Sequence, residues 1–326
     1  MRRNIVSIQP LLLTLILILY TASMNPRATA KTEQSPIIIA SDSEFTSGGF
    51  PGSGTEADPY RIENLRITTN ALTKNGIEIR NTNTHFVIHN CAINASYIGI
   101  LVENVSLGTA SIIGNVIEGI TEEGGGIVLG ADGVTVTNNT CTGFIEGIHT
   151  NYADDCTITH NNFSNNTYHG ISLRNSNDNY VAHNTIKGNK AHGIFIIRSS
   201  TGNTVANNTL SGNSQIESYD WDDIYHFTVK SQGLDEGQGN HWYEEETHTG
   251  NRWSDYSGKG EYLIDGSAKA VDKYPASADT SPSTPAEHSE DTEANGIPWL
   301  GAQDILLGVT AGILLTWLSA RGVLLD

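Results

Sequence analysis

Sulfur-containing residues are scarce, since the 326-residue chain has three cysteines and two methionines. Three is an odd number, which excludes a disulfide framework as the organising principle of the fold. We expect Cys91, Cys141 and Cys156 to be buried thiols. Met1 and Met24 both lie within the first 30 residues, so the rest of the chain cannot form a methionine-rich copper(I) site.

Basic residues are also few, with 18 Lys and Arg against 36 Asp and Glu, for a net charge of −18. Binding to nucleic acid depends on basic side chains that neutralise phosphates. The sequence has no basic stripe of this kind, so we expect no nucleic-acid partner.

Long apolar runs occur only at the two ends of the chain. At the N-terminus, Arg2 and Arg3 precede an apolar stretch at residues 11–20, and Ala-Thr-Ala follows at residues 28–30. This order predicts a secretory signal peptide over residues 1–30. An uncleaved membrane anchor is the alternative, although the apolar stretch is short for a membrane span.

At the C-terminus, residues 276–296 are rich in Ser, Thr, Pro and acidic residues and contain no Lys or Arg. This composition predicts a solvated, disordered stalk. Residues 297–326 contain an uncharged apolar stretch, at 305–320, and predict a single C-terminal transmembrane anchor. A segment that is removed by processing is the alternative.

Between these ends, a six-residue phrase of the form apolar-x-x-Asn-x-apolar returns every 22 to 25 residues. Its asparagines are Asn90, Asn115, Asn139, Asn161, Asn184 and Asn208. A second phrase, Gly-Ile-x-apolar, alternates with the first and begins at Gly76, Gly99, Gly126, Gly147, Gly170 and Gly193. A fixed period of this length is typical of a solenoid.

The repeats predict an all-β fold, a parallel β-helix of six to seven coils over residues 60–213. Apolar residues alternate at period two in short runs, which indicates strands. Asn and Gly at fixed offsets indicate tight turns. We expect the six asparagines to stack as an amide ladder. Residues 31–59 then form an N-terminal lead-in and cap, and residues 214–275 form a C-terminal cap.

The C-terminal cap segment is rich in aromatic residues, among them Trp221, Trp242 and Trp253. Such a cluster can close the open end of a solenoid, which otherwise exposes a strand edge and the end of the core. We expect this role, and the alternative is that the aromatic rings stack on sugars.

Two flanking segments resemble a known family. Residues 54–62 read Gly-Thr-Glu-Ala-Asp-Pro-Tyr-Arg-Ile, and residues 250–256 read Gly-Asn-Arg-Trp-Ser-Asp-Tyr. With Asp-Lys-Tyr-Pro at residues 272–275, they are similar to the lead-in, cap and ending of NosD-type right-handed β-helix proteins. The resemblance covers roughly residues 50–275. It implies a single right-handed parallel β-helix, and either a copper-binding accessory role in metalloenzyme maturation or a surface role. The C-terminal stalk and anchor depart from the copper-maturation members.

Four histidines fall in two columns when the repeats are stacked. His160 and His183 each precede a ladder asparagine, and His169 and His192 each precede a glycine of the second phrase. Two imidazoles about 4.8 Å apart can share a copper or zinc ion if both rings face outward. The alternative is that histidine is tolerated at a polar turn. His89 would begin the first column, which Gly114 and Asn138 interrupt.

An enzyme that acts on polysaccharides is a rival interpretation, because glycoside hydrolases place carboxylates together for acid–base chemistry. The nearest candidates, Asp154 and Asp155, fall in a turn where Asp commonly caps the chain. A lyase would need acidic residues beside a basic one, and Arg174 and Arg198 have no matching acidic column. The sequence therefore favours a non-catalytic protein, with a polysaccharide lyase or hydrolase as the alternative.

A binding surface is the remaining interpretation. The third position of the Gly-Ile-x-apolar phrase faces outward and carries Glu78, Leu101, Val128, His149, Ser172 and Phe195. Its apolar members could contact a cell-surface glycan or protein, unless the C-terminal segment folds over them. Six Asn-x-Ser/Thr triplets could carry glycans. They begin at Asn94, Asn104, Asn138, Asn162, Asn165 and Asn207. We therefore expect a secreted, membrane-tethered β-helix that presents a binding face outside the cell or on the periplasmic side.

Overall fold

The computed structural model describes residues 31–69, 74–221 and 225–278. The predicted signal peptide and anchor, and all of the predicted stalk after residue 278, lie outside the described residues. The chain divides into two compact units, residues 1–281 and 282–326, and the described residues all belong to the first.

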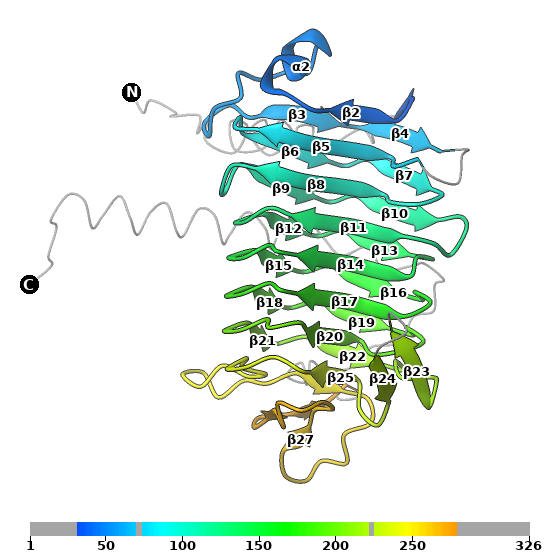
Figure 1. The fold of residues 1–326 in the computed structure, drawn as a ribbon, viewed down its shortest axis with the longest axis vertical. Helices are drawn as coiled ribbons and strands as arrows, with labels where there is room; N and C mark the ends of the chain where they lie inside the picture. The colour runs from blue at the N-terminus through cyan, green and yellow to red at the C-terminus, as the bar shows by residue number, and fades with distance from the viewer. Residues whose placement is uncertain (1–30, 70–73, 222–224, 279–326) are drawn as a thin grey trace, which may run out of the picture. The chain divides into compact units, whose positions relative to one another are not determined.

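The described residues form a parallel β-helix built from three sheets, which we call A, B and C (Figure 1). Along the chain, a complete coil contributes one strand to sheet B, then one to sheet C and one to sheet A. Sheet A contains β1 (Thr32–Gln34), β4 (Leu65–Thr68), β7 (Ala92–Ala95), β10 (Val116–Gly119), β13 (Thr140–Thr142), β16 (Asn162–Ser164), β19 (Thr185–Lys187), β22 (Thr209–Ser211), β26 (Arg252–Trp253) and β29 (Ala276–Ser277). Sheet B contains β2 (Ile37–Ile39), β5 (Ile77–Thr82), β8 (Ile100–Val105), β11 (Gly125–Gly130), β14 (Glu146–Asn151), β17 (His169–Arg174), β20 (Ile194–Ile197) and β25 (Gly233–Asp235). Sheet C contains β3 (Tyr60–Glu63), β6 (Phe86–His89), β9 (Ala110–Ile113), β12 (Thr135–Thr137), β15 (Thr157–Thr159), β18 (Tyr180–Ala182) and β21 (Thr204–Ala206).

The predicted β-helix is confirmed, but the stack is longer than the six to seven coils predicted. Over the described residues, sheet A has ten strands, sheet B eight and sheet C seven. The additional strands come from the flanking segments, where β1 and β2 precede the repeats and β25, β26 and β29 follow them. These segments lack the complete Asn and Gly phrases, although Asn251 directly precedes β26 and extends the ladder, so the repeat pattern did not reveal that they continue the stack. The predicted stalk boundary at residue 276 falls within the pairing of β26 with β29.

Branched apolar side chains fill the centre of each coil. In sheet B, Ile77, Ile100 and Ile127 are paired in register from one coil to the next, and the same column continues through Ile148 and Ile194. All five have no exposed surface. Burial of a side chain of this size contributes about 1.5–3 kcal/mol, so the columns of isoleucine are a principal source of the stability of the stack.

The glycine of the second phrase marks a place where no side chain fits. A Cβ at Gly99 would overlap both the side chain of Ile117 and the carbonyl oxygen of Gly126. The glycine of the Gly-Ile-x-apolar phrase therefore recurs because the next coil lies too close for a side chain at this position.

Both ends of the core are covered by aromatic side chains. At the N-terminal end, helix α2 (Asp42–Ser47) buries Phe45, which stacks on Tyr60 with 4.8 Å between ring centroids. At the C-terminal end, Trp242 and Trp253 are fully buried, and Tyr262 stacks on Trp253 at 3.9 Å. The predicted closing role of the tryptophans is therefore seen for these two.

Two small antiparallel pairs complete the C-terminal region. β23 (Ser218–Trp221) pairs with β24 (Tyr225–Thr228), and β27 (Tyr262–Leu263) pairs with β28 (Val271–Asp272). The β23–β24 hairpin packs on the outer side of sheet B, where Tyr219 and Phe227 contact Phe195.

Candidate ligand-binding face

The asparagine ladder forms as predicted for five of its six members. The side-chain amide nitrogens of Asn115, Asn139, Asn161 and Asn184 each donate to the side-chain oxygen of the next asparagine, at 2.9–3.0 Å. The same oxygen also accepts the backbone N–H of the preceding member, and the ladder continues from Asn208 to Asn251. These asparagines are buried, so the ladder satisfies turn groups that water cannot reach.

Asn90 is not a member of the ladder, and its predicted place was wrong by one residue. The backbone N–H of Cys91 donates to the side-chain oxygen of Asn115, so Cys91 occupies the ladder position in that coil. Asn90 lies one position earlier, has a φ of 50° and donates to Asn64. The phrase was misaligned because Asn suits both the ladder and the left-handed turn beside it. All three cysteines are free and buried, as predicted.

His160 and His183 belong to this left-handed column. Both have a φ of 58°, and their exposed rings stack with 5.0 Å between centroids. The predicted juxtaposition of the pair is therefore observed. His89 is not in this column, because it pairs in register with Ile113 in β9. In that coil the left-handed position is occupied by Asn90, so the predicted position of His89 was one residue too early.

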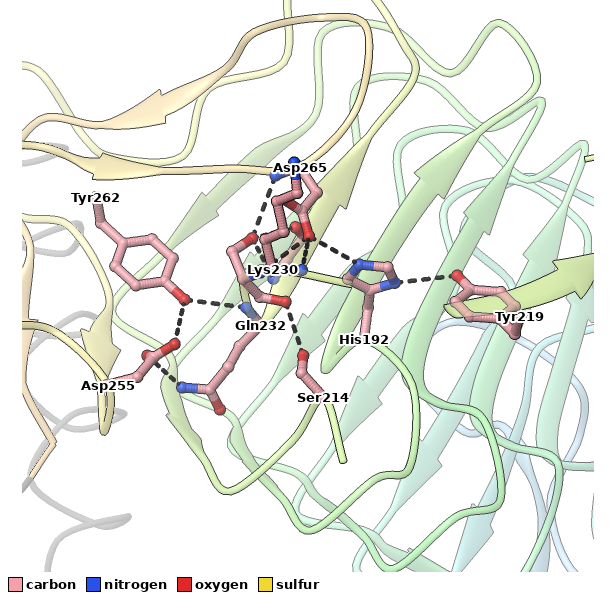
Figure 2. A network of polar contacts seen from close by, with 10 residues as sticks. His192, Ser214, Tyr219, Lys230, Gln232, Asp255, Tyr262 and Asp265 are labelled. Carbon is pink, nitrogen blue, oxygen red and sulfur yellow. Dashed lines mark hydrogen bonds and ion pairs between the residues drawn. The ribbon is translucent and has the colours of Figure 1, made fainter. Parts of the chain in front are cut away.

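His169 and His192 do not face outward into solvent, which the metal hypothesis required of them. Both are fully buried beneath the β23–β24 hairpin, and the ring of His169 stacks on Phe195 at 4.1 Å. In Figure 2, His192 lies between Tyr219 and Asp265, with Nδ1 3.0 Å from the tyrosine hydroxyl and Nε2 3.3 Å from the carboxylate. The carboxylate can only accept, so Nε2 donates to it and Nδ1 accepts from Tyr219. Both ring nitrogens of His192 are therefore occupied by structural partners.

The outward column of sheet B has the predicted register, from Glu78 and Leu101 through Val128 and His149 to Ser172 and Phe195. It forms the centre of what we call the sheet B face, the outer surface of β8, β11, β14 and β17. Three of these positions are not open as predicted: Leu101 and Ser172 are buried, and Phe195 is covered by the β23–β24 hairpin. The part that remains open lies on the N-terminal side of the hairpin.

An ion pair on the sheet B face was not predicted from the sequence. One nitrogen of Arg174, Nη2, donates to both carboxylate oxygens of Glu146 at 2.6 Å, and Nε donates to the hydroxyl of Ser172 at 3.0 Å. The sequence has no acidic column to match Arg174, and the structure places a single acidic residue, Glu146, beside it. It was missed because Glu146 pairs in register with His169, so the ion pair runs diagonally across the sheet.

His149 completes this cluster. Its Nε2 lies 3.5 Å from Nη1 of Arg174, and its Nδ1 lies 3.4 Å from Glu146. Arg174 has only donors, so Nε2 of His149 accepts and the proton of the neutral ring is on Nδ1, which faces the carboxylate. Burial, together with the charges of Arg174 and Arg198, lowers the pKa of His149 to about 3. Burial raises the pKa of Glu146, and Arg174 opposes this shift.

The stability of the fold should therefore depend on pH through His149. In the unfolded chain this histidine takes up a proton near its ordinary pKa of 6.5, whereas in the fold it stays neutral down to about pH 3. The stability is thus present above pH 6.5 and is lost as the pH falls toward 3, by up to about 1.4 kcal/mol per pH unit. Urea unfolding from pH 7 to pH 4 should show this decline, with a smaller slope in His149→Gln.

His226→Gln is the matched control for this titration, because the side chain of His226 is 64% exposed. It should retain the slope of the unaltered protein. An equal slope in His149→Gln and the unaltered protein would contradict the assignment.

Asp154 and Asp155 have structural positions, as their place in a turn suggested. Oδ1 of Asp154 accepts the backbone N–H of Asn177 at 2.6 Å and its side-chain amide at 3.1 Å. Asp155 has a φ of 56° and is exposed.

The six Asn-x-Ser/Thr asparagines all lie on the outside of the coils. Asn104, Asn138, Asn162 and Asn165 are exposed, and Asn94 and Asn207 are partly buried. Their suitability for glycans stays a prediction.

A groove of about 260 Å³ crosses the sheet B face. Its floor is β11, and its lining includes Tyr97, Glu103, Val128, His149 and Asn151. It lies directly beside the Glu146–Arg174 ion pair, since β14 carries both Glu146 and two of the lining residues. Its lining combines aromatic, apolar and hydrogen-bonding side chains.

These features define a parallel β-helix protein with a polar groove on one sheet. Residues 36–258 match the family described as "Periplasmic copper-binding protein (NosD)". The chain belongs to this family, as the flanking segments suggested.

Two further comparisons add little. No curated protein matches the chain. Among solved structures, the Dettilon tailspike protein (gp208) is similar, with a TM-score of 0.39 and 13% identity over 72% of this chain. The match covers 50% of the tailspike chain.

The family description raises the question of which residues could bind copper. Of the four histidines predicted as ligands, His160 and His183 fit, because their imidazoles are exposed and adjacent. His169 and His192 are fully buried, and both ring nitrogens of His192 have hydrogen-bond partners. Within the described ranges, no group of three or more His, Cys, Asp or Glu side chains is placed to hold a metal. The same residues include no helix long and apolar enough to cross a membrane.

Proposed function

We propose that this chain is a non-catalytic binding module that presents the sheet B face to a ligand outside the cytoplasm. The groove along β11 is the observation that carries the proposal. It lies on a stack of paired strands and buried isoleucines. Binding residues on such a rigid sheet are held in place before the ligand arrives, which lowers the entropic cost of binding.

The charges beside the groove support binding more than catalysis. A glycosidase needs one carboxyl group to donate a proton and a second to activate water or attack the sugar. Glu146 is bound by Arg174 at both oxygens, and Glu103 is paired with Arg80 at 3.0 Å. Both carboxylates are thus held by guanidinium groups, which suits them to fixed hydrogen-bonding roles.

We also propose that the module is secreted and tethered to a membrane by its C-terminal segment. The signal-like residues 1–30 and the apolar residues 305–320 support this. The family description as periplasmic supports the same side of the membrane.

The binding proposal can be tested with an envelope fraction from the source cells, which contains membrane, protein and polysaccharide. Purified full-length protein should retain this fraction on a sensor surface, and Val128→Arg should abolish retention by filling the groove. Thr157→Arg, at a partly exposed position of β15 in sheet C, is the matched control and should bind normally. Equal retention by both variants would overturn the proposal, and release of sugar products from polysaccharide would overturn its non-catalytic part.

A second candidate function is copper binding by His160 and His183, and their stacked, exposed rings favour it. Titration with Cu²⁺ should then show one site that is lost in His160→Ala and in His183→Ala. His226→Ala removes another exposed histidine and should leave the site intact. Unchanged affinity in both column variants would exclude this pair.

A further inference from the structure

The groove on the sheet B face exists because glycine occupies two positions of β11 where neighbouring strands carry side chains. Gly130 pairs in register with Glu103 of β8, and Gly125 pairs with Glu146 of β14. A Cβ at Gly125 would meet the outward side chain of Val128, which shows that this position also faces the groove. The missing side chains leave a channel that follows β11, with walls from the β8 and β14 coils.

The channel has walls of different chemistry. Tyr97 precedes β8 on one side and is 43% exposed, so one aromatic surface is open to a ligand. Val128 gives the floor an apolar centre, and Asn151 on the opposite wall is exposed and offers both donors and an acceptor. Tyr97 lies before the start of β8 and Asn151 at the end of β14, so the ring and the amide line opposite ends of the channel. This lining suits an extended ligand with both C–H surfaces and hydroxyl groups.

The charges near the channel are neutralised within the protein. Glu103 is paired with Arg80, and Glu146 is paired with Arg174. His149 is neutral, since burial lowers its pKa to about 3. The channel thus has no spare cation for a carboxylate or sulfate group, and the net charge of −18 repels polyanions.

We infer that the channel along β11 binds a segment of an uncharged oligosaccharide, with Tyr97 stacked on a sugar ring and Asn151 and Glu103 hydrogen-bonded to its hydroxyl groups. This inference rests on the proposed function, because it names the ligand class of the same face. It does not involve His160 and His183, which lie in the left-handed turn beside the asparagine ladder and not on the sheet B face.

Isothermal titration of the full-length protein tests the inference directly. The neutral probes are cellohexaose, maltohexaose and mannohexaose, and the acidic probes are hexamers of galacturonate and mannuronate. At least one neutral hexamer should bind, and Tyr97→Ala and Asn151→Ala should each weaken it about tenfold. Val128→Phe should abolish binding by filling the floor of the channel.

Tyr152→Ala is the matched control, since Tyr152 is 70% exposed and does not line the channel. It should bind normally. Failure of every neutral hexamer, or neutral binding unaffected by the three channel variants, overturns the inference. If the acidic hexamers alone bind, or if envelope retention still depends on Val128 without neutral binding, the inference falls and the proposed function stands. If envelope retention is also independent of Val128, both fall.

Discussion

Asn161→Ala should destabilise the fold by roughly 3–5 kcal/mol, because it leaves several buried groups without hydrogen bonds. The two hydrogens of the side-chain nitrogen of Asn161 are shared among three acceptors at 3.0 Å, the carbonyls of Val136 and Thr159 and the side-chain oxygen of Asn184. Its oxygen accepts from both the backbone and the side chain of Asn139. Alanine supplies none of these hydrogen bonds, and Asn161 is only 2% exposed. Urea or thermal unfolding measures the change.

Asn162→Ala is the matched control for this substitution. It is the same chemical change one residue away, at an exposed position of β16. We expect its effect to stay within about 0.5 kcal/mol, as for most surface substitutions. Similar losses in the two variants would show that the ladder contributes no more than an ordinary surface asparagine.

Trp253→Ala should cost about 3–5 kcal/mol, through the cavity that remains when a large buried side chain is removed. Trp253 has no exposed surface, stacks on Tyr262 and lies 6.1 Å from Trp242. Its indole nitrogen also donates to Asp272 at 2.9 Å, so the substitution removes a buried hydrogen bond. The thermal unfolding midpoint should fall accordingly.

Leu263→Ala is the control for Trp253→Ala, because Leu263 lies in the same cap and is 70% exposed. It should leave the midpoint nearly unchanged. If Trp253→Ala kept its stability and lost glycan binding instead, the tryptophan would be a ligand contact and its closing role would be wrong.

Periodicity alone predicted the coils because each repeat places the same residue type in the same environment. The ladder asparagines and the column of glycines recur for this reason. The sequence pattern was misaligned at Asn90, because one coil carries Cys91 where the others carry asparagine. A backbone N–H can donate to the next asparagine whatever its own side chain is, so the pattern tolerates this exception.

The repeat pattern could not predict contacts that do not recur, and it left the covering of Phe195 by the C-terminal segment as an alternative. The diagonal pair of Glu146 with Arg174 joins residues 28 positions apart, a separation that is not the period. The hairpin that covers Phe195 and the strands that lengthen the stack come from segments with no repeat. The positions of the hairpin and of the added strands depend on where these segments fold back onto the stack.

The sequence by itself determined that this chain is a parallel β-helix, because burial of identical columns imposes a period that can be counted. Its resemblance to the NosD family came from the flanking segments at residues 54–62 and 250–256. Only the tertiary structure decided which outward positions remain open. It buried His169 and His192 and left His160 and His183 exposed. It also placed two glycines of β11 between walls that carry paired charges. The physical reason is that core packing repeats along the chain, whereas a binding site requires a departure from the repeat.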